Sequence, residues 1–141
     1  MREILFRGKM KKAGVWVYGA FCRSDCDTPT GPSVNRANII MYDEPFDGYW
    51  VEVDPETVGQ YTGLTDKNGK KIFEGDIVKA DKFNTPNKLY VIKYDLLLGA
   101  FIGEDNGTMY FTTFDGDSEL FEIIGNIHDN QELIGGKEDG N

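Results

Sequence analysis

The chain has 141 residues, of which 40% are hydrophobic and 13% aromatic, and its formal net charge is −9. This composition excludes a disordered chain, and the length suits one domain, or one domain with an added module, that folds without disulfides or metal. The longest apolar run, residues 96–102, is too short for a membrane helix of roughly 20 residues, so we expect a cytoplasmic protein with no membrane contact.

The first 58 residues predict an N-terminal β region that forms a separate arm or layer. Its apolar runs are short and rich in β-branched and aromatic residues, which is typical of strands. Residues 22–38 are polar and hold two prolines and a glycine, so they predict a long loop. Asp54 before Pro55 predicts a single helical turn at most, because Gly59 follows closely. The strands of this region are expected at residues 4–6, 15–18, 39–42 and 49–53.

The most regular pattern of the chain begins at residue 60. Asn68-Gly69 predicts the tip of a tight hairpin, because both residues tolerate positive φ. The Gly75-Asp76 step, inside a strand-like run, predicts a sharp bend. Together with the later strands, this pattern predicts a mainly β protein in which residues 59–134 form a small, strongly bent barrel of the SH3-like type. Residues 135–141 are polar and predict a disordered tail. The later strands are expected at residues 89–94, 99–103, 109–114 and 120–124.

Five blocks of sequence carry a resemblance to a known family. They are Arg2-Glu3-Ile4 with Phe6-Arg7, Gln60 to Leu64, Asp66 to Val78, Phe121 to Asn130, and Glu132-Leu133. In this order they resemble the YopX family of small phage and prophage proteins, whereas residues 9–59 are longer and more polar than a minimal member needs. The resemblance implies a β-rich fold and a phage origin, and it transfers no activity, cofactor or catalytic residue. The family-motif residues, which we expect to be structural, are Gln60, Tyr61, Thr62, Gly63, Leu64, Asp66, Asn68, Gly69, Glu74, Gly75, Asp76, Gly125 and Asn126.

Metal binding is not expected from the two cysteines. Cys22 and Cys26 have a C-x3-C spacing, but a zinc site needs four ligands and usually draws them from two such pairs. The chain has no second cysteine pair, and His128 is its single histidine. We therefore interpret Cys22 and Cys26 as thiols of the predicted loop.

Two acidic segments also lack the pattern of a reactive site. Asp115, Asp117 and Glu119 alternate as in a calcium loop, but the glycine and glutamate that an EF-hand places later in its loop are missing, so a solvated turn is predicted. His128 and Asp129 have no serine or cysteine nucleophile in a recognisable setting, which favours a structural or surface histidine. We therefore predict no catalytic residue, no cofactor and no metal.

Aromatic side chains form the remaining constellation. In residues 49–53, Trp50 is expected to face away from Val51 and Val53. An outward aromatic strip could stack single-stranded bases or anchor a protein partner, while core filling is the alternative for most of these residues. The acidity of the chain favours the protein partner over nucleic acid. The aromatic residues on or beside expected strands are Trp16, Tyr18, Trp50, Tyr61, Tyr90, Tyr94 and Tyr110.

Charge is distributed unevenly along the chain. The first 40 residues carry seven Lys or Arg and three acids, whereas the rest carries eight Lys and twenty-one acids. Such a distribution serves solubility, or contacts within the chain and between its copies. We therefore expect a non-enzymatic phage accessory protein of the host cytoplasm that binds a host or phage protein and forms homo-oligomers. The alternative is an acidic decoy that mimics nucleic acid and occupies a host DNA-binding protein.

Overall fold

The structure, a computed structural model, describes residues 2–28, 31–42, 45, 48–82, 85–105, 108–112 and 120–134. The chain divides into two compact units, unit 1 (Met1–Tyr61) and unit 2 (Thr62–Asn141), while the boundary expected from the sequence lay between residues 58 and 59. The described residues form strands and 3-10 turns and contain no α-helix, so the predicted mainly β class is confirmed. The predicted tail, residues 135–141, lies outside the described residues.

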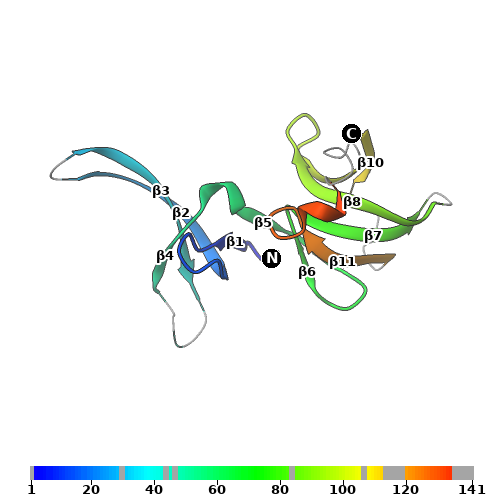
Figure 1. The fold of residues 1–141 in the computed structure, drawn as a ribbon, viewed down its shortest axis with the longest axis horizontal. Coiled ribbons are helices and arrows are strands. Elements are labelled where there is room, and N and C mark those ends of the chain that lie inside the picture. The colour runs from blue at the N-terminus through cyan, green and yellow to red at the C-terminus, as the bar shows by residue number, and fades with distance from the viewer. Residues whose placement is uncertain are drawn as a thin grey trace. The chain divides into compact units, whose positions relative to one another are not determined.

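Unit 1 is built on an antiparallel sheet with the strand order β4-β3-β2-β1-β5 (Figure 1). The expected hairpin between its first two strands is present, with Phe6 opposite Gly19. The expected single turn after β4 is also present, and the Asp54 carboxylate caps it by accepting a hydrogen bond from the Glu56 N–H over 3.1 Å. The elements are β1 (Phe6–Lys9), β2 (Trp16–Thr28), β3 (Gly31–Met41), β4 (Trp50–Val53), the 3-10 turn η1 (Pro55–Thr57) and β5 (Gly59–Thr65).

Residues 22–38 are not the predicted loop. Strands β2 and β3 continue through this segment as one long antiparallel hairpin, whose register runs from Gly19 opposite Met41 to Thr28 opposite Gly31. The ladder supplies partners for the backbone N–H and C=O groups, which outweighs the weak strand propensity of the polar side chains. Pro32 is compatible with β3 because β4 pairs with that strand only over residues 37–40, which leaves the rest of β3 as an edge.

The core of unit 1 lies on one face of its sheet. Successive side chains of a strand point to opposite faces, so the alternate residues of β2, β3 and β4 come together on this side. As predicted, Trp50 faces away from Val51 and Val53: Val53 is fully buried and Trp50 is 58% exposed. The buried cluster consists of Val17, Ala37, Ile39 and Val53, with Phe6, Met10, Phe21, Met41, Val51 and Val58 packed against it.

Unit 2 contains a second antiparallel sheet with the strand order β10-β9-β8-β7-β11. Strand β5 begins in unit 1 and ends in unit 2, and β6 is its hydrogen-bonded neighbour. The described strands do not close into a ring, so the SH3-like barrel stays a prediction. The elements are β6 (Lys71–Phe73), β7 (Asp76–Lys82), β8 (Thr85–Asp95), β9 (Ala100–Asp105), β10 (Thr108–Thr112), β11 (Phe121–Asn126) and the 3-10 turn η3 (Gln131–Leu133).

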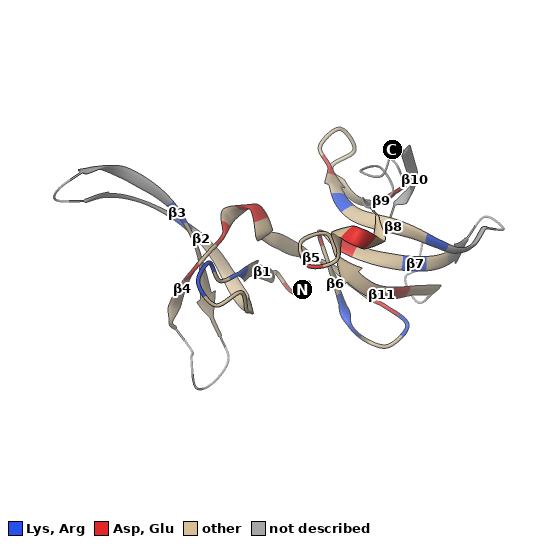
Figure 2. Ribbon diagram, viewed as in Figure 1, with Lys and Arg blue, Asp and Glu red and all other residues tan. Residues whose placement is uncertain are grey.

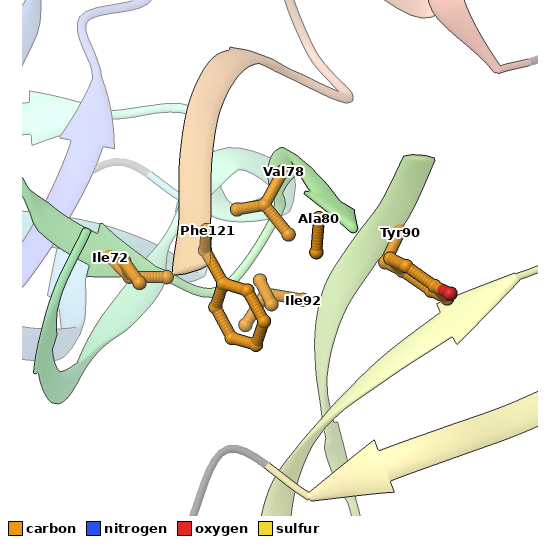
Figure 3. Close-up of a cluster of buried hydrophobic side chains, with 6 residues drawn as sticks. All are labelled: Ile72, Val78, Ala80, Tyr90, Ile92 and Phe121. Carbon is orange, nitrogen blue, oxygen red and sulfur yellow. The ribbon is translucent and has the colours of Figure 1, made fainter. Parts of the chain in front are cut away.

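The core of unit 2 joins side chains from four strands. Figure 3 shows the six buried side chains of this cluster, which come from β6, β7, β8 and β11. Leu64 and Ile123 pack against the cluster and are partly buried. Because β6 contributes Ile72 to the same cluster as the five-stranded sheet, the β5–β6 hairpin is held against that sheet by apolar packing. The cluster consists of Ile72, Val78, Ala80, Tyr90, Ile92 and Phe121.

Candidate functional site

In the turn after β5, the family-motif residue Asp66 joins the backbone of the turn to strand β11 by hydrogen bonds. The buried carboxylate accepts hydrogen bonds from the N–H groups of Asn68 (2.8 Å) and Lys70 (2.9 Å) within the turn, and from Ile123 of β11 (3.0 Å). Gly69 has a φ of 81°, as a tight turn needs. Burial alone would raise the pKa of Asp66, but the three N–H donors and the charge of Lys70 outweigh burial, so the pKa lies below its ordinary value of 3.8.

The strand that precedes this turn holds the other residues of the same motif. Within β5, Tyr61 is buried and Gln60 lies opposite Phe6 of β1. The Thr62 hydroxyl donates to the carbonyl of Ile72 over 2.9 Å. Gly63 has a φ of 92°, and the partly buried Leu64 packs on the core of unit 2. These contacts hold β5 against its neighbours.

The second motif, Glu74-Gly75-Asp76, makes the turn between β6 and β7. Gly75 has a φ of 90°, and its N–H donates to the carbonyl of Ile92 over 2.8 Å. The buried Asp76 carboxylate accepts a hydrogen bond from the Phe73 N–H over 2.8 Å. The predicted sharp bend is therefore a turn whose backbone is bonded to β8, and its carboxylate is used to shape the chain.

The third motif ends β11 in a turn organised by Asn126. Its side-chain oxygen accepts from the N–H groups of His128 (2.9 Å) and Asp129 (3.0 Å). Asn130 returns the interaction by accepting from the Asn126 N–H over 3.2 Å. A Cβ at Gly125 would lie 2.5 Å from the Asn130 side-chain oxygen, which explains the glycine. His128 and Asp129 thus lie in a turn.

The residues considered for metal binding are only partly described. Cys22 is a free, half-buried thiol that donates to the Arg23 carbonyl with a sulfur–oxygen distance of 3.6 Å. The side chain of Cys26 and the segment from Asp115 to Glu119 lie outside the described residues. Among the side chains that the structure does describe, no three His, Cys, Asp or Glu residues gather as metal ligands would.

The best-defined interaction surface is the side of the unit 1 sheet that faces away from its core. We call it the aromatic face; strand alternation places on it the exposed Tyr18 and Trp50, the half-buried Lys9, Trp16 and Ile40, and the buried Arg7. Trp50 is 58% exposed and Tyr18 is 43% exposed. Large aromatic side chains that remain this exposed on a regular sheet mark a contact surface.

The strand register fixes the geometry of the aromatic face. Tyr18 lies directly opposite Arg7, and the Arg7 guanidinium carbon is 4.6 Å from the centre of the Trp16 ring. On the adjacent strands Ile40 lies opposite Trp50. The cation over Trp16 holds that ring in place, so part of this surface is ordered before any partner arrives.

Positive charge borders the aromatic face. The connection between β1 and β2, which carries Lys11 and Lys12, forms a cationic end of unit 1 (Figure 2). The Lys11 ammonium lies 3.6 Å from the Glu52 carboxylate of β4, and both side chains are exposed to solvent. This exposed pair contributes little stability, so Lys11 can exchange Glu52 for a partner's carboxylate at low cost.

The remaining aromatic residues fall into three groups. Tyr61 and Tyr90 are buried, which corresponds to the core-filling alternative. Tyr94 is 43% exposed and packs edge-on against Phe101, with the ring centres 5.1 Å apart. The side chain of Tyr110 lies outside the described residues. The aromatic strip is thus a feature of unit 1, formed by part of the predicted set.

One exposed apolar element was not predicted from the sequence. We call it the leucine tip: Leu96, Leu97 and Leu98, in the turn between β8 and β9, are 87%, 97% and 52% exposed. Three leucines beside a strand pattern suggest a buried strand, which hides the feature. The available signal was their position between Asp95 and Gly99, since Asp and Gly are turn residues.

Acidic residues of unit 2 are interleaved with lysines on its sheet. The Lys93 and Glu104 side chains are 2.5 Å apart, and those of Lys88 and Asp105 are 2.8 Å apart. Glu122 of β11 lies within 3.6 Å of both Lys67 and Lys79. Figure 2 shows blue and red segments mixed over this unit. Among the described residues, the carboxylates of these strands therefore do not form an unbroken acidic row.

The comparisons with known proteins agree with this fold. The sequence profile of a family described as YopX protein matches residues 5–135. A crystal structure of protein EF1440 from Enterococcus faecalis is similar to the chain, with a TM-score of 0.52, 24% identity, and coverage of 95% of this chain and 99% of that one. No curated protein matches the chain. In the described part of the chain, no helix has the length and apolar character needed to cross a membrane.

Proposed function

The chain belongs to the YopX family, and we propose that it is a non-enzymatic phage or prophage accessory protein that acts in the host cytoplasm by binding another protein and by associating with itself. The acids of the family motif support a non-enzymatic role, because the carboxylates of Asp66 and Asp76 are used to hold backbone N–H groups.

The aromatic face is the observation that carries this proposal. Trp, Tyr and Arg are the residue types most enriched at the energetic centres of protein interfaces. Here Trp50 and Tyr18 are exposed, and beside them the buried Arg7 stacks on the half-buried Trp16. The cationic end of unit 1 favours a partner that presents acidic side chains around an apolar centre.

The acidic decoy has less support than the binding role. A mimic of nucleic acid needs rows of unpaired carboxylates, because it must reproduce the spacing of phosphate charges. The carboxylates of Glu104, Asp105 and Glu122 instead lie beside lysines. We therefore place the function in the aromatic face of unit 1.

We further infer that unit 2 is the small, strongly bent barrel of the SH3-like type. The β5–β6 turn is bonded to β11 through the Asp66 carboxylate and through the Lys67 N–H, which donates to the Phe121 carbonyl over 2.9 Å. Nuclear Overhauser contacts between this turn and β11 are expected in solution. A spectrum in which the hairpin makes no contact with β11 would contradict the barrel.

The binding role is tested by capture from cells that carry the prophage. Tagged protein is compared with Trp50→Ala, Tyr18→Ala and, as a matched control, Tyr94→Ala, since Tyr94 and Tyr18 are both 43% exposed but lie in different units. We expect specific proteins, quantified by mass spectrometry, to be enriched by the wild type and by Tyr94→Ala, and lost with the two variants of the aromatic face. Equal capture by all variants would refute the assignment.

A further inference from the structure

The leucine tip has no role in shaping its own turn. Exposed turns are usually built from Gly, Pro, Asn, Asp and Ser, each of which has a conformational reason to be there. Leu96, Leu97 and Leu98 have no such reason, and all three leave most of their side-chain surface in water. Contiguous exposed apolar side chains of this kind mark an interaction site.

The turn beneath the leucines is built to hold them in a fixed arrangement. The Asp95 carboxylate accepts hydrogen bonds from the N–H groups of Leu97 (2.8 Å) and Leu98 (3.0 Å). The Gly99 N–H donates to the Asp95 carbonyl over 2.8 Å, and Gly99 has a φ of 63°. A loop that is already ordered loses little conformational entropy when it binds, which favours a docking role.

We propose that the leucine tip of one copy docks on the aromatic face of a second copy. This inference rests on the proposed function, and it names the two surfaces that self-association uses. The tip presents exposed aliphatic side chains, whereas the face presents the exposed rings of Trp50 and Tyr18 beside the half-buried Ile40. Contact between them removes Trp50, Tyr18 and the three exposed leucines from water.

Charge complementarity selects a second copy as the occupant. The tip stands on Asp95, whereas the aromatic face carries Lys9 and is bordered by Lys11 of the β1–β2 connection. A membrane is a poorer occupant. Insertion of the three leucines would bring the Asp95 carboxylate to the lipid surface, and the net charge of −9 is repelled by anionic headgroups.

A contact between two different surfaces has a definite consequence for assembly. After the first contact one copy keeps an unused face and the other keeps an unused tip, so association is head-to-tail. The product is a closed ring or an open chain, in contrast to an isologous dimer that uses the same patch twice.

The test measures the oligomeric state of the full chain by sedimentation velocity over a range of concentrations. Leu97→Asp removes the tip and Trp50→Asp removes the face, and we expect each to raise the apparent dissociation constant by at least about tenfold. Leu120→Asp is the matched control, because Leu120 is an exposed leucine of unit 2 outside the tip, and it should leave the constant unchanged. Circular dichroism checks the fold of each variant, and Leu97→Ser replaces Leu97→Asp should the latter not fold.

Mixing the variants gives the decisive result. Leu97→Asp keeps an intact face and Trp50→Asp keeps an intact tip, so an equimolar mixture should form heterodimers at concentrations at which each variant alone stays monomeric. A monomeric wild type, an unaffected Leu97→Asp or a mixture that stays monomeric would overturn the inference. Leu97-dependent binding to phosphatidylcholine vesicles would overturn it too, because it would assign the tip to lipid. If the tip variants leave the oligomeric state unchanged while Trp50→Ala still abolishes capture of the partner protein, this inference is wrong and the proposed binding function stands.

Discussion

A single carboxylate, that of Asp66, links the turn of the β5–β6 hairpin to strand β11. It lies near the N–H groups of residues 68, 70 and 123, so it satisfies donors that are far apart in the sequence. Buried donors without an acceptor cost about 1–3 kcal/mol each. The family-motif aspartate therefore has a structural explanation, which requires no reaction.

Asp66→Asn is expected to lower the free energy of unfolding by about 2–3 kcal/mol at pH 7, because an amide keeps one acceptor oxygen and turns N–H donors toward the backbone donors. The folded-state pKa of Asp66 lies below the ordinary value of 3.8, so its stabilising effect is present above that value and is lost as the pH falls through the folded pKa. Urea titrations at pH 7 and pH 3 should show the difference between wild type and variant shrinking at the lower pH. A difference that is constant or grows would contradict the role of the charge.

Gly69 is expected to be a stability site for a different reason. Its φ of 81° is unfavourable for other residues, while the space around its missing Cβ is empty. Gly69→Val should therefore cost about 1–3 kcal/mol through backbone strain alone. Thr65→Val, which places the same side chain on an exposed extended residue of β5, is the control and should change the melting temperature little. Equal melting temperatures for the two variants would remove the turn assignment.

Among the secondary-structure elements, the sequence predicts those that are determined by neighbouring residues, such as tight turns and helix caps. Asn68-Gly69 indicates a hairpin, Asp54-Pro55 indicates a capped turn, and both are found. The β2–β3 hairpin could not be predicted, because it arises from backbone pairing that extends from Thr28 and Gly31 to Gly19 and Met41 and is independent of the polar side chains. Pro and Gly in residues 22–38 indicated a loop, but a strand edge tolerates them.

The candidate site likewise combines features set by local sequence patterns with features set by strand pairing. Alternation along β4 predicted that Trp50 faces outward, and the structure confirms it. The assembly of Arg7, Trp16 and Tyr18 beside one another depends on the register between β1 and β2, which no local pattern reveals. The leucine tip was not predicted, because the hydrophobicity of three leucines suggests burial, whereas the turn leaves their side chains exposed.

Close packing between β2 and β3 leads to a prediction for Gly19. A Cβ at this residue would lie 1.9 Å from the Ile40 carbonyl oxygen, so Gly19→Ala must push the two strands apart. We expect a loss of about 3 kcal/mol of stability. Because both tryptophans, Trp16 and Trp50, belong to unit 1, tryptophan fluorescence during urea unfolding reports on this unit.

The neighbouring substitution Ala20→Ser provides the control for Gly19→Ala, since Ala20 is half-buried on the opposite face of β2. It should unfold within about 0.5 kcal/mol of the wild type. A fluorescence transition of Gly19→Ala that coincides with that of the control would show that the strands are not packed as described.

For the whole molecule, the charge distribution should control self-association. Deletion of the first 20 residues would not isolate the effect of charge on self-association. It removes β1 and the start of β2 from the middle of the unit 1 sheet, so it also disrupts the fold. A charge reversal at Lys11 leaves the sheet intact, since its side chain is exposed and its pair with Glu52 contributes little. Lys71→Glu is the matched control, because it makes the same change in net charge at an exposed residue of unit 2.

We expect Lys11→Glu to weaken association and Lys71→Glu to leave it unchanged, as measured by sedimentation velocity at 0.1 M salt. Raising the salt to 1 M shortens the Debye length from about 10 Å to about 3 Å, so the wild type should approach the behaviour of Lys11→Glu. Partial association should persist at 1 M salt, because burial of Trp50 and the leucines is not screened by ions. If Lys11→Glu and Lys71→Glu weaken association equally, net charge alone controls it and the cationic border of the aromatic face has no part. If 1 M salt abolishes association completely, the apolar contact is absent.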